Sequence, residues 1–154
     1  MSQKSIHVAA VVLLDSRRRV LTVRKRGTER FMQPGGKPEP DEGPRRTALR
    51  EIAEEIGLHL QPAQLQPMGR FRAAAANESG YDVVCENYLV DMAQLPAEPS
   101  LGEEILAQLQ PAAEIEELRW IPLDQLRPSD DLAPLLTEQV APAVRRILAA
   151  EGRS

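Results

Sequence analysis

One apolar segment near the N-terminus constrains the fold more than any other feature. Residues 8–14 form a run of seven Val, Ala and Leu residues in which apolar and polar positions do not alternate. Such a run is typical of a β-strand that is buried on both faces. It is too short to cross a membrane as a helix, which takes about 20 apolar residues. We therefore expect a central strand that other elements cover on both sides.

The rest of the chain is predicted to alternate between strands and helices. Further strands are predicted at 20–23, 68–76, 81–90 and 117–121, and helices at 44–56 and 135–150, with a short helix inside the loop 93–113. The first two strands would form a hairpin, and Pro142 would kink the last helix. The Gly- and Pro-rich segment 24–42 is predicted to hold no regular element. This order favours an α/β or α+β fold with a mixed sheet, in a single domain over residues 1–154.

Composition and charge exclude some functions. The chain carries 19 basic and 23 acidic residues, a net charge of −4, whereas binding a nucleic-acid polymer needs a basic surface. A small nucleotide is not excluded, because a few arginines or a metal ion suffice to hold its phosphates. Cys85 is the single cysteine, and the N-terminus lacks the layout of a secretory signal. We therefore expect a cytoplasmic protein without membrane association.

The helix predicted at 44–56 carries an unusual acidic side. On a helical wheel Glu51, Glu54 and Glu55 fall together, opposite the apolar positions that must face the core. Like charges at these spacings repel by a few tenths of a kcal/mol per pair. A solvated acidic surface is one interpretation. The other is a site for Mg²⁺, which prefers oxygen ligands and shares phosphate oxygens with a substrate; Gly35 and Gly36, just before the helix, would let the backbone approach closely.

Segment 36–58 resembles the Nudix box. Every position that the box specifies is filled: Gly36, Glu42, and then Arg50-Glu51-Ile52-Ala53-Glu54-Glu55-Ile56-Gly57-Leu58. The flanking segments 31–37 and 117–121 also resemble MutT-like Nudix hydrolases, so the resemblance covers most of the chain. One departure is Gly43-Pro44 where relatives often have Ser or Thr as the helix cap. Glycine is a tolerable N-cap, and proline fits the first helical position.

The resemblance implies a fold, a reaction and a set of site residues. The fold is an α/β/α sandwich with a mixed sheet and a loop–helix–loop. The reaction is hydrolysis of a pyrophosphate linkage in a nucleoside diphosphate derivative with Mg²⁺ or Mn²⁺. By position, the implied metal ligands are Glu51, Glu54, Glu55 and the Gly35 carbonyl, the implied catalytic residues include Glu51, Glu54 and Arg50, and Glu42 supports the site. A homodimer is frequent among relatives and stays open here.

Residues outside the box are assigned with alternatives. Glu114 is the first candidate for the proton acceptor, with Glu86 as its competitor, and an ordinary surface role is the other interpretation of both. The residues predicted to bind the substrate are Arg24, Arg26, Gly36 and Lys37 near the phosphates and Phe31 against the base. Phe71, Tyr81 and Tyr88 are further candidates for stacking on the base, and at least some of the five aromatic residues must belong to the core. A solvated strand end is an equally good interpretation of Arg24 and Arg26.

The substrate is left open by the sequence. The first expectation is a nucleoside triphosphate, damaged ones included, giving a monophosphate and pyrophosphate. A dinucleoside polyphosphate, ADP-ribose or a nucleotide sugar is the second. A non-catalytic module that binds nucleotides is the third, although such modules often lack box glutamates and this chain has them all.

Overall fold

A computed structural model describes residues 4–94 and 105–152 of the chain. The strands are β1 (Lys4–Leu14), β2 (Arg19–Lys25), β3 (Gly35–Gly36), β4 (Gln66–Ala74), β5 (Tyr81–Asp91) and β6 (Ile115–Pro122). The helices are α1 (Pro44–Ile56) and α3 (Ala141–Ala150), and α3 continues a π-helical segment, η4 (Leu135–Val140). Short 3-10 turns lie at Pro62–Gln64, Met92–Gln94 and Leu123–Gln125. None of the described helices is both long and apolar enough to span a membrane.

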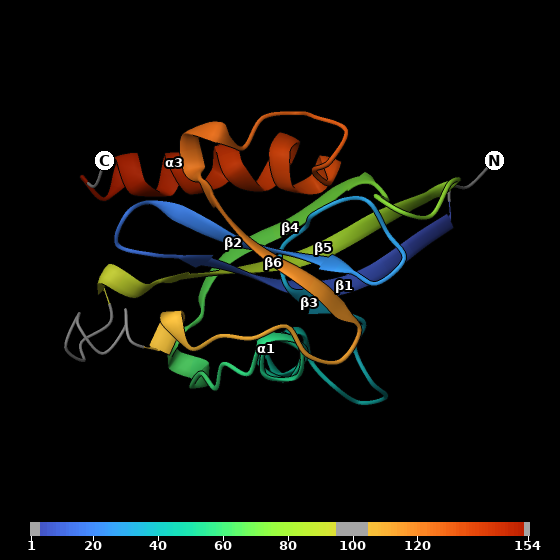
Figure 1. Cartoon of the computed structure of the whole chain (residues 1–154), viewed down its shortest axis with the longest axis horizontal. Helices are drawn as coiled ribbons and strands as arrows, with labels where there is room; N and C mark the ends of the chain where they lie inside the picture. Colours follow the sequence, from blue (N-terminus) through green and yellow to red (C-terminus); the bar gives the residue numbers. More distant parts are fainter. Residues whose placement is uncertain (1–3, 95–104, 153–154) are drawn as a thin grey trace.

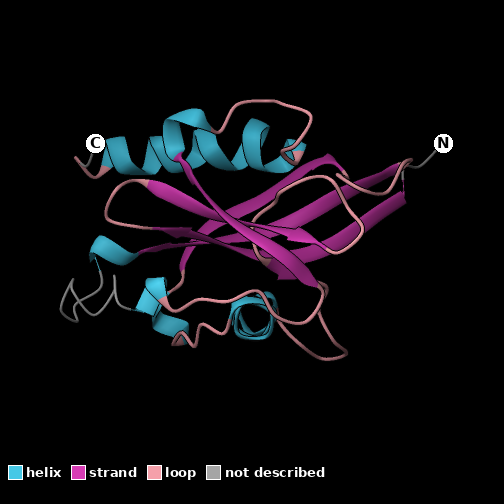
Figure 2. Ribbon diagram, viewed as in Figure 1, coloured by secondary structure: helices cyan, strands magenta, loops and turns pink. Residues whose placement is uncertain are grey.

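The strands form one mixed sheet in the order β4-β5-β1-β2-β6, and β3 pairs with β1. The β1–β5 pair is parallel, and the other pairs are antiparallel. Figures 1 and 2 show α1 on one face of this sheet and α3 on the other. The arrangement is an α/β/α sandwich, as the sequence resemblance implied.

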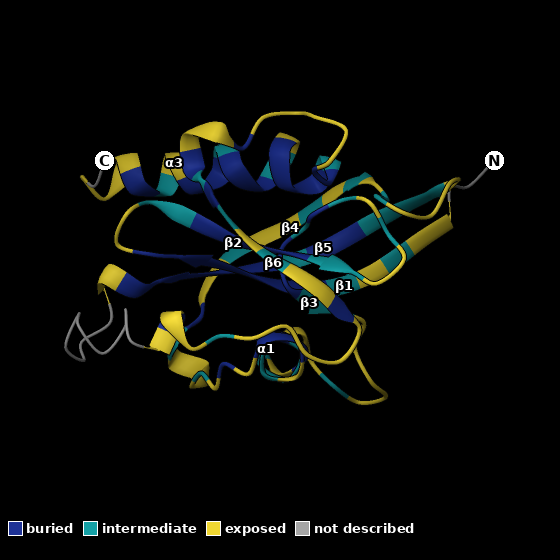
Figure 3. Cartoon of the chain, in the orientation of Figure 1, coloured by how far each residue is buried: buried dark blue, intermediate teal, exposed yellow. Residues whose placement is uncertain are grey.

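Strand β1 is the central element of both cores. Val11 and Leu13 pack in the cluster that α1 covers, whereas Val12 and Leu14 pack in the cluster that α3 covers. All four side chains are fully buried, because successive residues of a strand point to opposite faces and both faces are covered. The buried stretch of β1 is visible in Figure 3. The prediction of a strand buried on both sides is confirmed.

The ends of α1 follow the expected capping. Gly43 is the N-cap and Pro44 the first helical residue, and Gly57 has a φ of 75°, in the left-handed region. Its N–H donates to the Ala53 carbonyl at 3.0 Å. Glycine adopts this conformation without a steric penalty, so the helix ends where the sequence predicts.

Two expectations about regular structure need correction. Segment 24–42 does hold a strand, since Gly35 and Gly36 pair with Ala10 and Ala9 of β1. Proline and glycine forbid most elements, but two glycines can lie flat against a neighbouring strand. The predicted helix 135–150 is present as η4 followed by α3, with Pro142 in the first turn of α3. Of the loop 93–113, residues 105–107 are helical and 95–104 lie outside the described residues.

Candidate active site

Arg50 lies at the centre of the acidic side of α1. Its Nε and Nη2 each donate to Glu42 at 2.8 Å, in a forked arrangement. Its Nη1 donates to Glu51 at 2.9 Å and to Glu54 at 3.4 Å, and its Nη2 also donates to the Lys37 carbonyl at 3.0 Å. These hydrogen bonds lower the pKa of Glu42 to about 2. One guanidinium therefore offsets much of the repulsion that the sequence indicates.

The three neighbouring glutamates of α1 differ sharply in exposure. The side chain of Glu54 is 51% exposed and that of Glu51 14%, whereas Glu55 is 1% exposed. The expectation that all three point away from the core is wrong for Glu55. On the helical wheel Glu55 lies about 60° from Ile52, between Glu51 and the apolar side, and there it meets the backbone of Gly35 in β3. A carboxylate fits where no side chain opposes it.

Glu55 is held by the backbone of β3. The N–H of Gly35 donates to Glu55 Oε1 at 3.0 Å, and Oε2 is buried without a hydrogen-bond partner among the described residues. Burial raises the pKa of Glu55 to about 8, and the negative charges of Glu51 and Glu114 act in the same direction. A buried carboxylate with a free oxygen is an unfavourable arrangement unless another partner binds there.

The glycines of β3 are required by close packing. A Cβ atom on Gly35 would overlap the carbonyl oxygen of Ala9, and a Cβ atom on Gly36 would overlap the carboxylate of Glu51. Backbone and carboxylate thus lie in direct contact at this point. Only glycine leaves room for both.

The donor set fits a hard divalent cation. The free oxygen of Glu55 faces inward, and Glu51 and Glu54 supply further carboxylates from the same helix. As the side chains stand, no three His, Cys, Asp or Glu residues within 4–94 and 105–152 converge closely enough to ligate one ion. Arg50 holds Glu51 and Glu54 in ion pairs of 2.9 and 3.4 Å. A bound ion would compete with this guanidinium for the two carboxylates.

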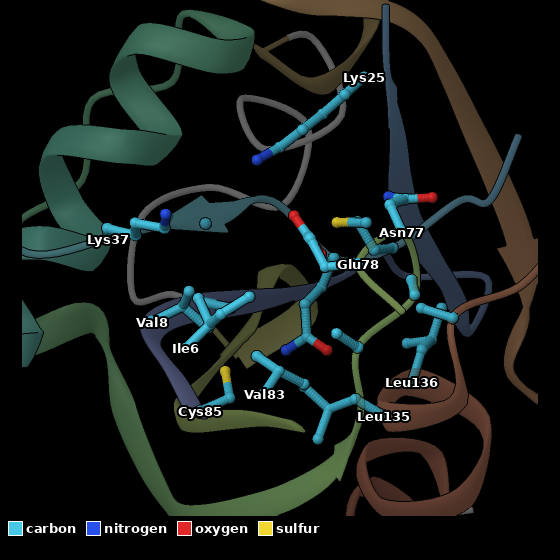
Figure 4. A pocket seen from close by; sticks show the side chains of 18 of the residues that line it. Ile6, Val8, Lys25, Lys37, Asn77, Glu78, Val83, Cys85, Leu135 and Leu136 are labelled. Carbon is cyan, nitrogen blue, oxygen red and sulfur yellow. The ribbon is translucent and has the colours of Figure 1, made fainter. Parts of the chain in front are cut away.

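A cavity of about 440 Å³ begins beside these carboxylates and extends under η4. Its polar end is lined by Gly35, Gly36, Lys37, Glu51, Lys25 and Glu114, and its apolar end by Ile6, Val8, Val83, Leu135 and Leu136. Figure 4 shows Lys25 and Lys37 on one side of the cavity and Leu135 and Leu136 on the other, next to the C-terminal helix. The cavity therefore joins a charged region to an aliphatic one.

Glu114 lies at the polar end, where its carboxylate is 3.3 Å from Lys25 Nζ. Its competitor Glu86 lies elsewhere and pairs with Arg70 at 2.7 Å. Glu86 lines a separate hollow of about 180 Å³ together with Glu42 and Thr47. The structure thus brings Glu114, and not Glu86, to the cavity that Glu51 lines.

Three predicted substrate-binding residues do not line this cavity. Arg24 pairs with Glu117 and Arg26 with Glu116, at 3.2 and 3.3 Å. Phe31 is 2% exposed, and the Arg119 guanidinium lies 3.9 Å from its ring centroid. The prediction that Phe31 stacks on a base is therefore wrong, because its ring is packed in the core.

Sequence reasoning missed two amides and one lysine. Gln33 and Asn87 are 5% and 1% exposed and hydrogen-bond each other, and Lys25 lines the cavity. Asn87 could have been noticed as a polar residue inside an otherwise apolar strand. No local sequence pattern indicates that Gln33 and Lys25 line the cavity beside Glu51.

Comparisons with known proteins agree with this architecture. A MutT/nudix family protein from Enterococcus faecalis is 20% identical, with a TM-score of 0.69 over 97% of this chain and 64% of that one. This chain thus spans less than two thirds of that protein. A MutT NUDIX hydrolase from Burkholderia pseudomallei is 21% identical, with a TM-score of 0.64 over 94% and 99%. An Ap4A hydrolase from C. elegans is 14% identical, with a TM-score of 0.61 over 96% and 98%.

Such identities show a shared fold and do not identify a substrate. A comparison with curated proteins finds no match. The family model of the NUDIX domain, however, matches residues 4–147. Because this match covers nearly the whole chain, the chain belongs to the NUDIX family and is a hydrolase acting on pyrophosphate linkages of nucleoside diphosphate derivatives.

Proposed function

We propose that this hydrolase cleaves nucleoside triphosphates, damaged ones included, to a nucleoside monophosphate and pyrophosphate. The observation that supports this proposal best is the cavity of about 440 Å³, which has a charged end at α1 and an apolar end under η4. Small-molecule sites of this size enclose most of their ligand. One nucleoside fits the apolar end while its phosphates extend toward Glu51 and Lys37.

A divalent ion, Mg²⁺ or Mn²⁺, would be held by Glu54 and Glu55, with Glu51 as a further ligand or as the residue that orients water. The Gly35 carbonyl is a further proposed ligand. When bound, the ion supplies charge neutralisation on the pyrophosphate oxygens and acidifies a water molecule. The free oxygen of Glu55 supports this assignment, because the ion would give it the partner that it lacks.

Glu114 is the proposed proton acceptor. The attacking water forms a new bond to phosphorus, the bond to the pyrophosphate oxygen breaks, and the proton of the water passes to the Glu114 carboxylate. Lys25 Nζ lies 3.3 Å from this carboxylate and holds it in place. Lys37 and the N–H group of Gly36 bind phosphate oxygens. Arg50 positions Glu51 and Glu54, and Glu42 in turn anchors Arg50.

The alternatives remain hydrolysis of a dinucleoside polyphosphate, ADP-ribose or a nucleotide sugar. The matched Ap4A hydrolase shows that this fold serves such substrates elsewhere. We place the triphosphate first because one nucleoside with its phosphates would occupy both the apolar and the charged end of the cavity. We also propose a cytoplasmic location, on the ground that the one cysteine, Cys85, is buried and unpaired.

Incubation of the purified protein with Mg²⁺ and a nucleotide panel tests the proposal. The panel holds the common nucleoside triphosphates, 8-oxo-dGTP, Ap4A, ADP-ribose and UDP-glucose. We expect triphosphates to be consumed, with pyrophosphate and not phosphate as the second product. If only Ap4A, ADP-ribose or UDP-glucose were hydrolysed, the substrate class would be that of the hydrolysed compound and not a triphosphate. No turnover of any compound would favour a non-catalytic binding module.

A further inference from the structure

The cavity is also lined by Gln33, which hydrogen-bonds a second buried amide, Asn87, and neither residue has a part in the proposed mechanism. Gln33 lines the cavity and is 5% exposed. Its Nε2 donates to Asn87 Oδ1 at 2.7 Å. Asn87 is 1% exposed and lies on β5. Burying two amides costs free energy unless their donors and acceptors are hydrogen-bonded. The neighbouring groups therefore determine which way each amide is oriented.

The orientation of Asn87 is fixed by its neighbours. Its Nδ2 donates to the Cys85 carbonyl at 2.9 Å and to the Gly69 carbonyl at 3.4 Å. The Cys85 thiol lies 3.3 Å from Asn87 Oδ1, as a donor. Burial raises the pKa of Cys85 to about 12, so this thiol keeps its proton. Asn87 must therefore point its carbonyl oxygen toward Gln33.

The same constraint fixes Gln33. Because Asn87 presents an acceptor, Gln33 has to present its NH₂ group to Asn87 and keep its carbonyl oxygen on the other side. This Oε1 accepts no hydrogen bond from any described residue, and the side chain borders the cavity. The hydrogen bonds of Gly69 and Cys85 orient Asn87, and Asn87 in turn orients Gln33. The Gln33 Oε1 atom is thus left as a hydrogen-bond acceptor at the cavity wall.

Away from α1 the lining of the cavity is mostly apolar, and its other polar residues are Thr28, Asn77 and Glu78. No aromatic side chain from the described residues lines the cavity, so a base cannot be held there by stacking on a ring. The apolar lining includes the aliphatic side chains of Val83, Leu135 and Leu136. Aliphatic walls select for size and discriminate weakly between bases of one size, whereas a buried polar group discriminates strongly.

We propose that Gln33 is a specificity-determining residue that accepts a hydrogen bond from an N–H group on the substrate base, and that Asn87 is the positioning residue that fixes its orientation. The inference rests on the proposed function, since it takes the base to enter the apolar end of the cavity. Its ligand class is a purine nucleoside triphosphate whose base presents an exocyclic amino N–H to the inner wall. An analogue without that donor leaves Gln33 Oε1 unpaired.

The test compares kcat/KM for substrates that differ by one donor. ATP is paired with purine ribonucleoside triphosphate, which lacks the 6-amino group, and GTP with ITP, which lacks the 2-amino group. For the pair that carries the preferred base, we expect the wild type to favour the amino compound by about tenfold or more. Using a ratio cancels any general loss of active protein.

Two variants then locate the source of this preference. Gln33→Met keeps the shape of the side chain and removes the acceptor, so the ratio should fall to about one. Asn87→Leu keeps Gln33 but frees its amide to turn, so the ratio should fall as well, although every residue named as a substrate contact is intact. Gln125→Met, an exposed glutamine outside the cavity, is the matched control and should retain the wild-type ratio.

The outcomes separate the inference from the proposed function. If the wild type hydrolyses none of these triphosphates, the proposed function fails. If it hydrolyses them but neither pair differs, or if Gln33→Met keeps the wild-type ratio, the proposed function stands and the role of Gln33 is overturned. Should Asn87→Leu unfold, a ratio of about one for Gln33→Met supports the inference and an unchanged ratio refutes it.

Discussion

The two ends of the cavity are built in different ways. At the charged end, Arg50, Glu51 and Glu55 come from one helix, and the two glycines that receive them precede it by a few residues. At the apolar end, Gln33, Asn87 and Leu136 come from a loop, a strand and the C-terminal segment. The proposed metal ligands are thus local in sequence, whereas Glu114 and the groups that select the substrate are brought to the cavity only by folding.

The largest effect is expected at the charged end. Glu54→Gln and Glu55→Gln should each lower kcat by about 10²-fold or more, because each removes a proposed metal ligand whose charge is preorganised. The loss should be the same for every triphosphate, since neither residue contacts the base. Steady-state kinetics on two nucleotides measures both points. Glu116→Gln, an exposed carboxylate that pairs with Arg26, is the control.

If either variant changed the ratio of kcat between two nucleotides, its carboxylate would also take part in selecting the base, and the two ends of the cavity would not have separate roles. Glu55→Gln should also fold normally, because a neutral amide replaces a carboxylate whose charged form is disfavoured by burial. Full activity in either variant would refute its assignment as a ligand.

Gly35→Ala tests the close contact between β3 and β1. Its Cβ atom would overlap the Ala9 carbonyl, so we expect the free energy of unfolding to fall by about 2–3 kcal/mol. Gly43→Ala is the control for steric overlap, because a Cβ atom there meets nothing within 4 Å; as a change at the N-cap of α1 it should cost less than Gly35→Ala. Chemical denaturation of the two variants makes the comparison. Equal stability would mean that β3 can move away from the central strand at little cost.

The stability of the metal-free protein should depend on pH through Glu55. The pKa of Glu55 is about 8 in the folded chain, above its ordinary value of 4.5. Between these values the unfolded chain releases a proton that the folded chain keeps, so stability falls as pH rises. The expected slope approaches about 1.4 kcal/mol per pH unit. Denaturation in EDTA at pH 5 to 8 measures it.

The Glu55 contribution is isolated by two variants. Glu55→Gln should lose this slope, and Gln33→Met, at the apolar end, should keep it. A slope that survives in Glu55→Gln would assign the pH dependence to another group.

The smallest effect is expected from a shortened wall at the apolar end. Val83→Ala removes part of the surface against which the base packs, so KM should rise about fivefold while kcat changes little. Initial rates over a range of nucleotide concentrations separate the two constants. A fall in kcat with constant KM would place Val83 at the reacting groups instead.

The contrast between the two ends also explains how much the sequence predicts. The central strand, α1 with its caps, and the residues of the acidic cluster follow from local patterns, and they are where the structure has them. The burial of Glu55 was missed because a helical wheel describes one helix alone and does not show that the backbone of β3 packs against Glu55. Phe31 was misplaced because an aromatic residue beside a functional loop is as often core as ligand. Gln33 was missed because Asn87, its partner, lies 54 residues away.

The proposed activity requires that the carboxylates of α1 bind a divalent ion. Titration calorimetry with Mn²⁺ at pH 8 tests this most directly, on the wild type, Glu55→Gln and the control Glu116→Gln. We predict saturable uptake by the wild type and by Glu116→Gln, with affinity at least tenfold weaker in Glu55→Gln. Equal uptake by all three proteins, or none by the wild type even with a nucleotide present, would contradict the account.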